Sequence, residues 1–128
     1  MDNLEILSIG RNLLKAISGL DTAPKLQELW ISYNSIDKLS GIEKAPGLRI
    51  LYISNNKIAS WAEIDRLKDL TNLKELLLVG NPLYNDTPED KRGDYRVEVL
   101  KRCPTLLKLD GIAVDPDERS AAKAAGGL

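Results

Sequence analysis

The chain has 128 residues, enough for one domain with a continuous core, and its 29% of charged residues nearly cancel to a net charge of −1. This balance and the lack of a long apolar run give no reason to expect nucleic acid or a membrane as a partner. There is no histidine and one cysteine, Cys103. We therefore expect no metal, no cofactor and no enzyme activity, and a reducing, cytoplasmic location.

One frame, L-x-x-L-x-L-x-x-N-x-L, occurs four times along the chain without a gap. Its asparagines are Asn12, Asn34, Asn56 and Asn81. Four full matches are specific for leucine-rich repeats. Residues 1–114 are therefore predicted to form a leucine-rich repeat solenoid of the α/β class. Short parallel strands would line its concave face, helices or 3₁₀ turns its convex face, and a helical cap its C-terminal end.

The four asparagines follow the strand segments where the chain turns away. Their amides can bond backbone groups there, so we interpret them as a structural asparagine ladder. The first two returns are short, and Pro24 and Pro46 stop any helix before the next strand, which indicates 3₁₀-like turns. The third return, SWAEIDRLKDL, has Ser60 and Glu63 at capping-box spacing and predicts a true α-helix with Trp61 in the core.

The C-terminal cap begins with Thr87 as the expected N-cap and Pro88 at the first helical position, which predicts a helix over about 88–102. The sequence PTLLKLDG after it predicts a truncated fifth strand. Residues 115–128 form a tail in which Asp115 and Glu118 repeat the capping pattern. We expect a short helix that is docked on the body, docked on a partner, or frayed and disordered.

The first frame begins at Leu4, and nothing in the first residues covers its strand. We expect either that the chain is a fragment lacking an N-terminal cap, which we favour, or that the open edge pairs with another chain. Self-association through the exposed edge would be a consequence of the missing N-terminal part.

The concave face carries the residues that we expect to bind a partner. Strand side chains alternate, so residues between the core leucines project from this face, and stacking the frames places Trp30, Tyr52 and Leu77 side by side. An exposed aromatic patch with charged residues around it is typical of an interaction hot spot, and a partner helix suits it. The alternative is that a helix of the same protein covers the sheet. The expected set is Arg11, Tyr33, Ile6, Glu28, Trp30, Ile50, Tyr52, Glu75, Leu77 and Val79.

Three segments carry a resemblance to a known family: LQELWISYNSIDKLSGIEK, LRILYISNNKIASWAEIDRL and LLLVGNPL. They resemble the outer-arm axonemal dynein light chain 1 family of SDS22-like leucine-rich repeat proteins, from about Leu4 to Val114. The resemblance implies a non-catalytic cytoskeletal subunit of the axoneme of cilia and flagella. Such a subunit binds a dynein heavy chain, contacts tubulin or microtubules, and regulates motility. The resemblance maps the heavy-chain surface to Trp30, Tyr52, Leu77 and their neighbours.

Two other functions remain open at this point. The cap sequence YRVEVLKRCPTLLKLDG is similar to that of a wider class, which includes a regulator of protein phosphatase 1 and the spliceosomal U2 A-prime protein. The chain would then be a scaffold that regulates protein phosphatase 1, or a spliceosomal-type adaptor whose partner is itself a protein.

Overall fold

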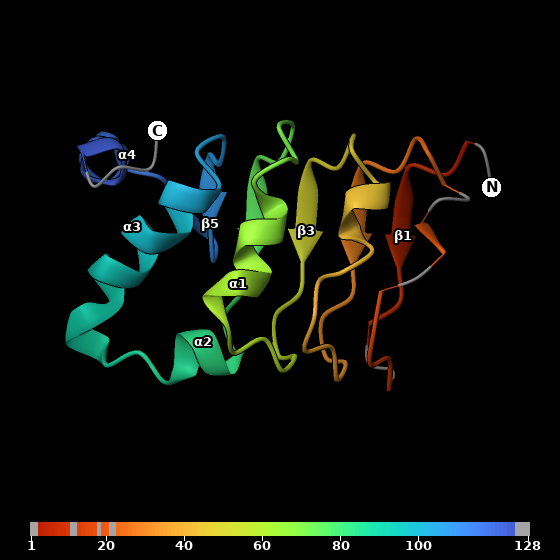
Figure 1. Ribbon diagram of the computed structural model, residues 1–128, viewed down its shortest axis with the longest axis horizontal. Coiled ribbons are helices and arrows are strands. Elements are labelled where there is room, and N and C mark those ends of the chain that lie inside the picture. The colour runs from red at the N-terminus through yellow and green to blue at the C-terminus, as the bar shows by residue number, and fades with distance from the viewer. Residues whose placement is uncertain (1–2, 11–12, 18, 21–22, 125–128) are drawn as a thin grey trace.

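The computed structural model of the protein describes residues 3–10, 13–17, 19–20 and 23–124. Within these residues, short strands form a single sheet and follow one another across it in chain order (Figure 1). The first five strands pair in parallel and the sixth is antiparallel to the fifth. The strands are β1 (Ile6–Ser8), β2 (Glu28–Trp30), β3 (Ile50–Tyr52), β4 (Glu75–Leu77), β5 (Lys108–Leu109) and β6 (Ile112–Ala113).

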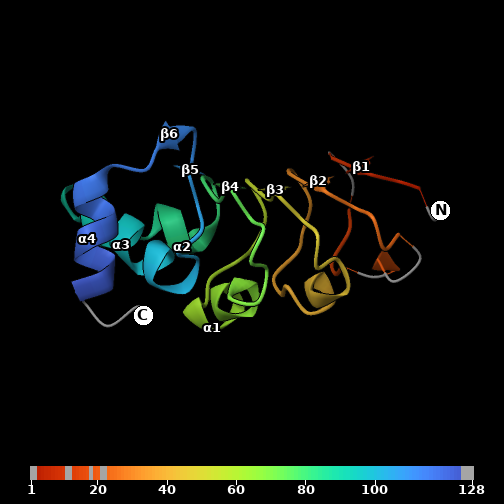
Figure 2. The ribbon, with the colours of Figure 1, turned by 90° about the horizontal axis from the view of Figure 1, so that it is seen from above.

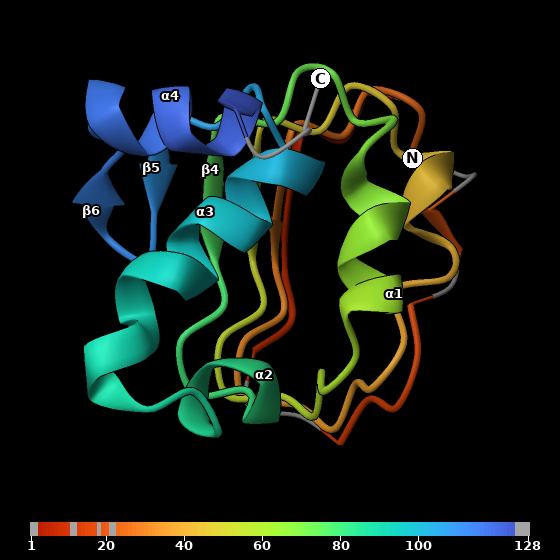
Figure 3. The same ribbon diagram turned by 60° about the vertical axis from the view of Figure 1, so that its left-hand side comes forward.

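The helical segments lie on one side of this sheet and at its C-terminal end (Figure 2). Figure 3 shows α3 and α4 side by side at that end. The α-helices are α1 (Trp61–Ile64), α2 (Pro82–Asn85), α3 (Arg92–Arg102) and α4 (Pro116–Ala124), and the 3₁₀ turns are Ile42–Lys44, Asp65–Leu67 and Glu89–Lys91. The predicted solenoid, with a parallel sheet on one face and helical returns on the other, is confirmed. The described helices are each too short or too polar to cross a bilayer.

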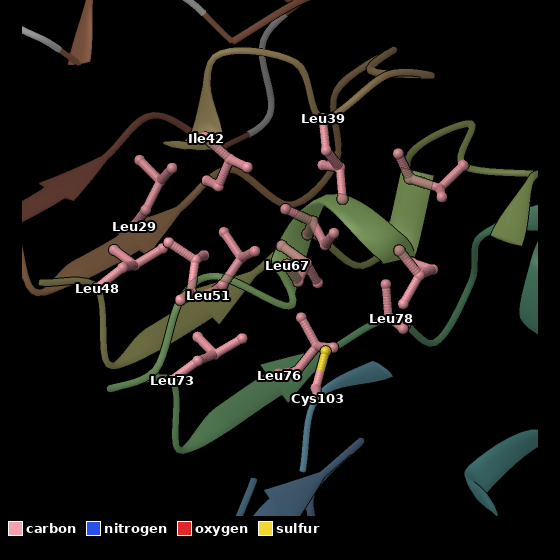
Figure 4. Close-up of a cluster of buried hydrophobic side chains, with 14 of the residues drawn as sticks. Leu29, Leu39, Ile42, Leu48, Leu51, Leu67, Leu73, Leu76, Leu78 and Cys103 are labelled. Carbon is pink, nitrogen blue, oxygen red and sulfur yellow. The ribbon is translucent and has the colours of Figure 1, made fainter. Parts of the chain in front are cut away.

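The core lies between the sheet and the returns, as Figure 4 shows. Leu29, Leu51 and Leu76 are register partners on successive strands, and all three are buried. Ile42 and Leu67 reach them from the return segments and are also buried. A shift of one residue in the register of any strand would turn its central leucine to solvent. The stabilisation lost with the burial of that side chain would be roughly 1.5–3 kcal/mol.

The asparagine side chains satisfy the backbone in each turn. Asn56 Nδ2 donates to the carbonyls of Ile31 and Ile53, both at 3.0 Å, and its Oδ1 accepts the backbone N–H of Ile36 at 3.0 Å. Asn34 and Asn81 make the same contacts one repeat earlier and one repeat later. Each asparagine therefore joins its own turn to the preceding one. Asn12 lies outside the described residues.

The return of the third unit is helical for less of its length than predicted. Ser60 caps it as expected, because its hydroxyl accepts the backbone N–H of Ala62 at 3.2 Å. Glu63 donates its backbone N–H to the Ser60 carbonyl at 3.1 Å, but its side chain does not bond back to the Ser60 N–H. Its carboxylate accepts the backbone N–H of Leu39 in the neighbouring return at 2.7 Å and a bond from Arg66 at 3.0 Å. The α-helix thus ends after one turn and continues as 3₁₀, whereas the second return is 3₁₀ as expected.

Trp61 at the start of this helix is half-buried rather than enclosed in the core. The guanidinium of Arg102 lies 4.7 Å from the centre of its ring, and the Tyr95 ring lies at 6.0 Å. Trp61 therefore joins α1 to α3 at the edge of the core, where one face of the indole is covered by a cation.

The C-terminal cap forms a helix where the sequence indicated one, but its start differs. Thr87 is not the N-cap, because its hydroxyl donates to the carbonyl of Leu83 at 2.9 Å and so completes α2 instead. The chain then enters a 3₁₀ turn at Glu89–Lys91 and continues as α3. Tyr95, Val99, Leu100 and Cys103 are buried against the last repeat.

A short hairpin follows the fifth strand and was not predicted. Asp110 and Gly111 have φ values of 53° and 81°, which close a tight turn and bring β6 back along β5. The Asp110 carboxylate also satisfies backbone groups at this end of the sheet. Its Oδ1 accepts the backbone N–H groups of Leu78 at 2.6 Å and Val79 at 2.9 Å, and its Oδ2 accepts the Tyr95 hydroxyl at 2.9 Å.

The tail helix α4 is docked on the body. The expected capping box forms, because Asp115 accepts the N–H of Asp117 at 2.7 Å and Glu118 accepts the N–H of Asp115 at 2.9 Å. Arg96 of α3 pairs with Glu118 and also donates to the carbonyl of Leu109 at 2.8 Å. Of the three alternatives for the tail, docking on the body is the one present. The boundary at residues 114–115 stays a prediction.

Candidate partner-binding surface

Three successive strands place apolar side chains in one row on the open side of the sheet. Trp30 pairs in register with Tyr52, and Tyr52 pairs with Leu77. The centres of the Trp30 and Tyr52 rings are 5.7 Å apart and their planes are tilted by 34°, a geometry in which aromatic rings attract each other. We call Trp30, Tyr52, Leu77 and the neighbouring Ile6 and Ile50 the aromatic patch.

A second row runs beside the first across the same strands. The register of the sheet places Ile6, Glu28, Ile50, Glu75 and Lys108 in that order. The row therefore alternates between apolar and acidic side chains over the first four strands. Glu28 and Glu75 thus lie next to apolar side chains on this face and do not simply surround the aromatic patch.

Tyr52 is fixed in place by one of these acids. Its hydroxyl donates to Glu75 Oε2 at 2.8 Å. This hydrogen bond is the main cause of the raised pKa of the Tyr52 phenol, followed by burial and by the negative charges of Glu75 and Glu28. The phenol thus remains protonated over a wider pH range than a free tyrosine, and the hydrogen bond fixes its ring beside Trp30.

The third row, at the ends of the strands, is more polar. The Ser54 hydroxyl donates to Ser32 Oγ at 2.9 Å, and the Ser54 backbone N–H donates to the same oxygen at 3.1 Å. Tyr33 has a φ of 60°, in the left-handed region that the turn after each strand requires, and its side chain is 48% exposed. Val79 is half-buried at the far end of this row.

The aromatic patch is displayed rather than covered. Trp30 is 40% exposed and Ile6 is 51% exposed, while Tyr52, Leu77 and Ile50 are half-buried by their neighbours within the sheet. In Figure 2, no helix of the described chain lies over the open side of the sheet, and α4 stays at the C-terminal end beside α3. The alternative that a described helix of the same chain covers the patch is therefore wrong.

The structure brings nine of the ten predicted residues onto this face or its border: Ile6, Glu28, Trp30, Tyr33, Ile50, Tyr52, Glu75, Leu77 and Val79. The tenth, Arg11, lies outside the described residues. Sequence reasoning missed the Ser32–Ser54 pair and Lys108, which extends the second row at β5. Both follow from continuing the same columns by one further position, so the repeat frame held enough information to find them.

The chemistry available on this surface is that of docking. Within the part of the chain that the structure describes, no group of three or more histidine, cysteine or acidic side chains is arranged to hold a metal ion. The surface offers flat aromatic area, a tyrosine held by a carboxylate, and two acidic side chains among apolar ones. These features suit contact with another protein surface.

Comparison with known proteins agrees with this architecture. A family model described as the NXF1/2/3/5 leucine-rich repeat domain matches residues 21–111. A chain in the crystal structure of the Drosophila melanogaster SNF/U2A′ complex superposes with a TM-score of 0.83 at 25% identity, over 96% of this chain and 68% of that one.

Curated relatives match more of the sequence. Dynein axonemal light chain 1 of Chlamydomonas reinhardtii is 64% identical over 129 residues, which cover 99% of this chain and 65% of that protein. The protein of the same name from Danio rerio is 55% identical over 119 residues, which cover 92% of this chain and 61% of that protein. The chain thus spans less than two thirds of the length of these relatives. The repeat frame, the sheet and the family match show that the chain belongs to the leucine-rich repeat family, with homologues that are named dynein axonemal light chain 1.

Proposed function

We propose that the chain is a non-catalytic interaction subunit of the axonemal outer dynein arm, and that it binds a dynein heavy chain through the aromatic patch. In this role it regulates ciliary or flagellar motility, with tubulin or microtubules as a further contact. The observation that carries the proposal is the exposed row of Trp30, Tyr52 and Leu77 on a sheet that the described chain leaves uncovered. The names of the homologues support an axonemal place for it.

A helix is the partner element that fits the row. Neighbouring strands lie about 4.8 Å apart, and one turn of an α-helix rises about 5.4 Å. A helix laid across the strands would therefore set one apolar side chain over each of Trp30, Tyr52 and Leu77. Trp30 is 40% exposed and Tyr52 is half-buried, so both rings keep apolar surface that such a helix would cover.

The direct test is the double variant Trp30→Ala, Tyr52→Ala with a heavy chain purified from outer arms and freed of its light chains. We expect the variant to stay folded, because both side chains leave the sheet on its open side. We expect it to bind at least about 2 kcal/mol more weakly if the rings form a hot spot. Leu13→Ala is the control, since Leu13 is 86% exposed and lies outside the patch. Full affinity in the folded double variant would overturn the proposal.

The microtubule contact is tested separately by cosedimentation with polymerised tubulin. We expect the chain to pellet with microtubules in the absence of heavy chain. If the double variant pellets as well, the microtubule contact lies outside the aromatic patch. No pelleting at any tubulin concentration would limit the function to the heavy chain.

Self-association is a further partner prediction. Among the described strands, β1 is paired on one side only, and Ile6 and Leu13 expose apolar area near it. An open strand edge of this kind can pair with a second copy. Analytical ultracentrifugation should show a monomer–dimer equilibrium, and a monomer at every concentration would refute the prediction.

A spliceosomal-type adaptor is the second candidate, and the structural match to a chain of the SNF/U2A′ complex favours it. The two functions differ in location. A fluorescent fusion in flagellated cells should label the axoneme under the first proposal and the nucleus under the second. Affinity purification from the same cells should recover dynein heavy chain, and recovery of protein phosphatase 1 instead would indicate a phosphatase scaffold.

A further inference from the structure

One acidic residue beside the aromatic patch lacks an ion-pair or hydrogen-bond partner for its carboxylate among the described residues. Glu28 lies between Ile6 and Ile50 in the register of the sheet, and its side chain leaves the same face of β2 as that of Trp30. The residue is half-buried. Among the residues that the structure describes, Glu28 has no ion pair and no hydrogen bond to its carboxylate.

Glu75, two strands away in the same row, is in a different position. It accepts the Tyr52 hydroxyl at 2.8 Å, and its neighbour in the register on β5 is Lys108. Its carboxylate therefore has a hydrogen-bond partner within the same chain. The two carboxylates face the same side of the sheet, but only that of Glu28 is left without a partner among the described residues.

A partner that covers the aromatic patch also buries the Glu28 carboxylate and must compensate its charge. Because Glu28 stands between two isoleucines and beside Trp30, a surface that packs on these side chains also removes water from the carboxylate. Burying an unpaired carboxylate is strongly unfavourable, whereas burying one against a cation with good geometry recovers the loss. A purely apolar partner surface is therefore a poor fit to this patch.

We propose that the segment docking on the aromatic patch presents an arginine or lysine to Glu28, on the same helix that packs apolar side chains over Trp30 and Tyr52. This inference rests on the proposed function and specifies the chemistry of the partner helix. Residues three and four apart on that helix are neighbours on its surface, so a basic residue can flank an apolar one at the spacing of the two rows. An arginine would in addition stack on the exposed Trp30 ring.

The test compares Glu28→Gln with Asp37→Asn. Both remove one negative charge, but Asp37 is exposed on the return of the second unit and has no hydrogen bond or ion pair among the described residues. Affinity for purified outer-arm heavy chain is measured at low and high salt, with circular dichroism to check folding. We expect Glu28→Gln to bind about tenfold more weakly or worse and to show a reduced salt dependence, Glu28→Lys to lose binding further, and Asp37→Asn to bind as the wild type does.

The outcomes separate this inference from the function on which it rests. If Trp30→Ala weakens binding while Glu28→Gln leaves affinity and salt dependence unchanged, the patch docks the heavy chain but no cation meets Glu28, and the inference is wrong. The same holds if Glu28→Gln binds more tightly, since the carboxylate would then be buried without compensation. If Trp30→Ala itself has no effect on heavy-chain binding, the proposed function fails first.

Discussion

Asn56 shows how a single polar side chain holds a turn of the solenoid together. Its amide nitrogen donates to the carbonyls of Ile31 and Ile53, and its amide oxygen accepts the N–H of Ile36. All three hydrogen bonds are buried. Asn56→Ala would leave these groups unpaired in the interior. We expect a loss of about 2–4 kcal/mol in the free energy of unfolding, measured by urea denaturation. Asn72→Ala, at an exposed position, should change it by less than about 0.5 kcal/mol, and equal effects of the two would refute the role of the ladder.

Cys103 illustrates the effect of burial on chemistry. Burial raises the pKa of its thiol to about 12, against a smaller lowering by the Arg102 charge. Because the folded pKa lies above the unfolded one, this group stabilises the fold fully below the ordinary thiol pKa, and its contribution is lost as the pH rises toward about 12. We expect a thiol reagent at neutral pH to label the native protein at least about a hundredfold more slowly than the protein unfolded in guanidinium chloride. Rapid labelling of the native state would contradict this.

Among the elements, α4 is held on the body by the Arg96–Glu118 ion pair, by bonds from Arg119 to the carbonyls of Pro104 and Leu106, and by the buried Ala122. The Arg96 guanidinium lowers the pKa of Glu118, and the N–H of Asp115 lowers it further. The folded pKa thus lies below the unfolded one, so the attraction is complete at neutral pH and is lost as the pH falls below the usual range of a glutamate. Glu118 also closes the capping box of α4. The helix should therefore loosen both in acid and when this carboxylate is removed.

Glu118→Gln tests this directly, with Asp117→Asn as the control that removes a charge from the same helical turn. Ala122 is buried against the body, so its methyl resonance reports whether α4 is docked. We expect this resonance to shift toward that of an exposed alanine in Glu118→Gln, and in the wild type on acidification, but not in Asp117→Asn at neutral pH. An unchanged Ala122 resonance in Glu118→Gln would show that the remaining contacts of α4, including those of Arg119, hold the helix without this carboxylate.

The repeat frame made most elements predictable, because four leucine or isoleucine residues and one asparagine per unit fix the strand, its inward face and the turn after it. The same frame predicted that Trp30, Tyr52 and Leu77 stand side by side. It did not predict the length of α1, which changes to 3₁₀ after Ile64, nor the bond from the backbone N–H of Leu39 in the neighbouring return to the Glu63 carboxylate. Such a contact depends on side-chain direction across units. The hairpin to β6 was missed although Asp110 and Gly111 form a dipeptide typical of a tight turn.

The molecule as a whole is stabilised through contacts between adjacent units, so its packing and its local stability should vary along the solenoid. Leu51 in β3 is packed between β2 and β4 and is fully buried, whereas Leu7 in β1 is paired on one side among the described strands and is half-buried. A cavity of about 80 Å³ also lies under β1, lined in part by Leu7, Leu14 and Leu29. The first unit is thus less well packed than the centre.

The same substitution at equivalent positions measures this gradient. Leu51→Ala should lower the free energy of unfolding by about 2–5 kcal/mol, because it opens a cavity between two neighbouring units. Leu7→Ala removes a side chain that is already partly solvated and should cost about 1 kcal/mol. Native-state hydrogen exchange should show the same order, with the β1 amides opening before those of β3. Equal costs and equal protection at the two strands would mean that the solenoid unfolds as one uniform unit, and that packing between neighbours does not set its local stability.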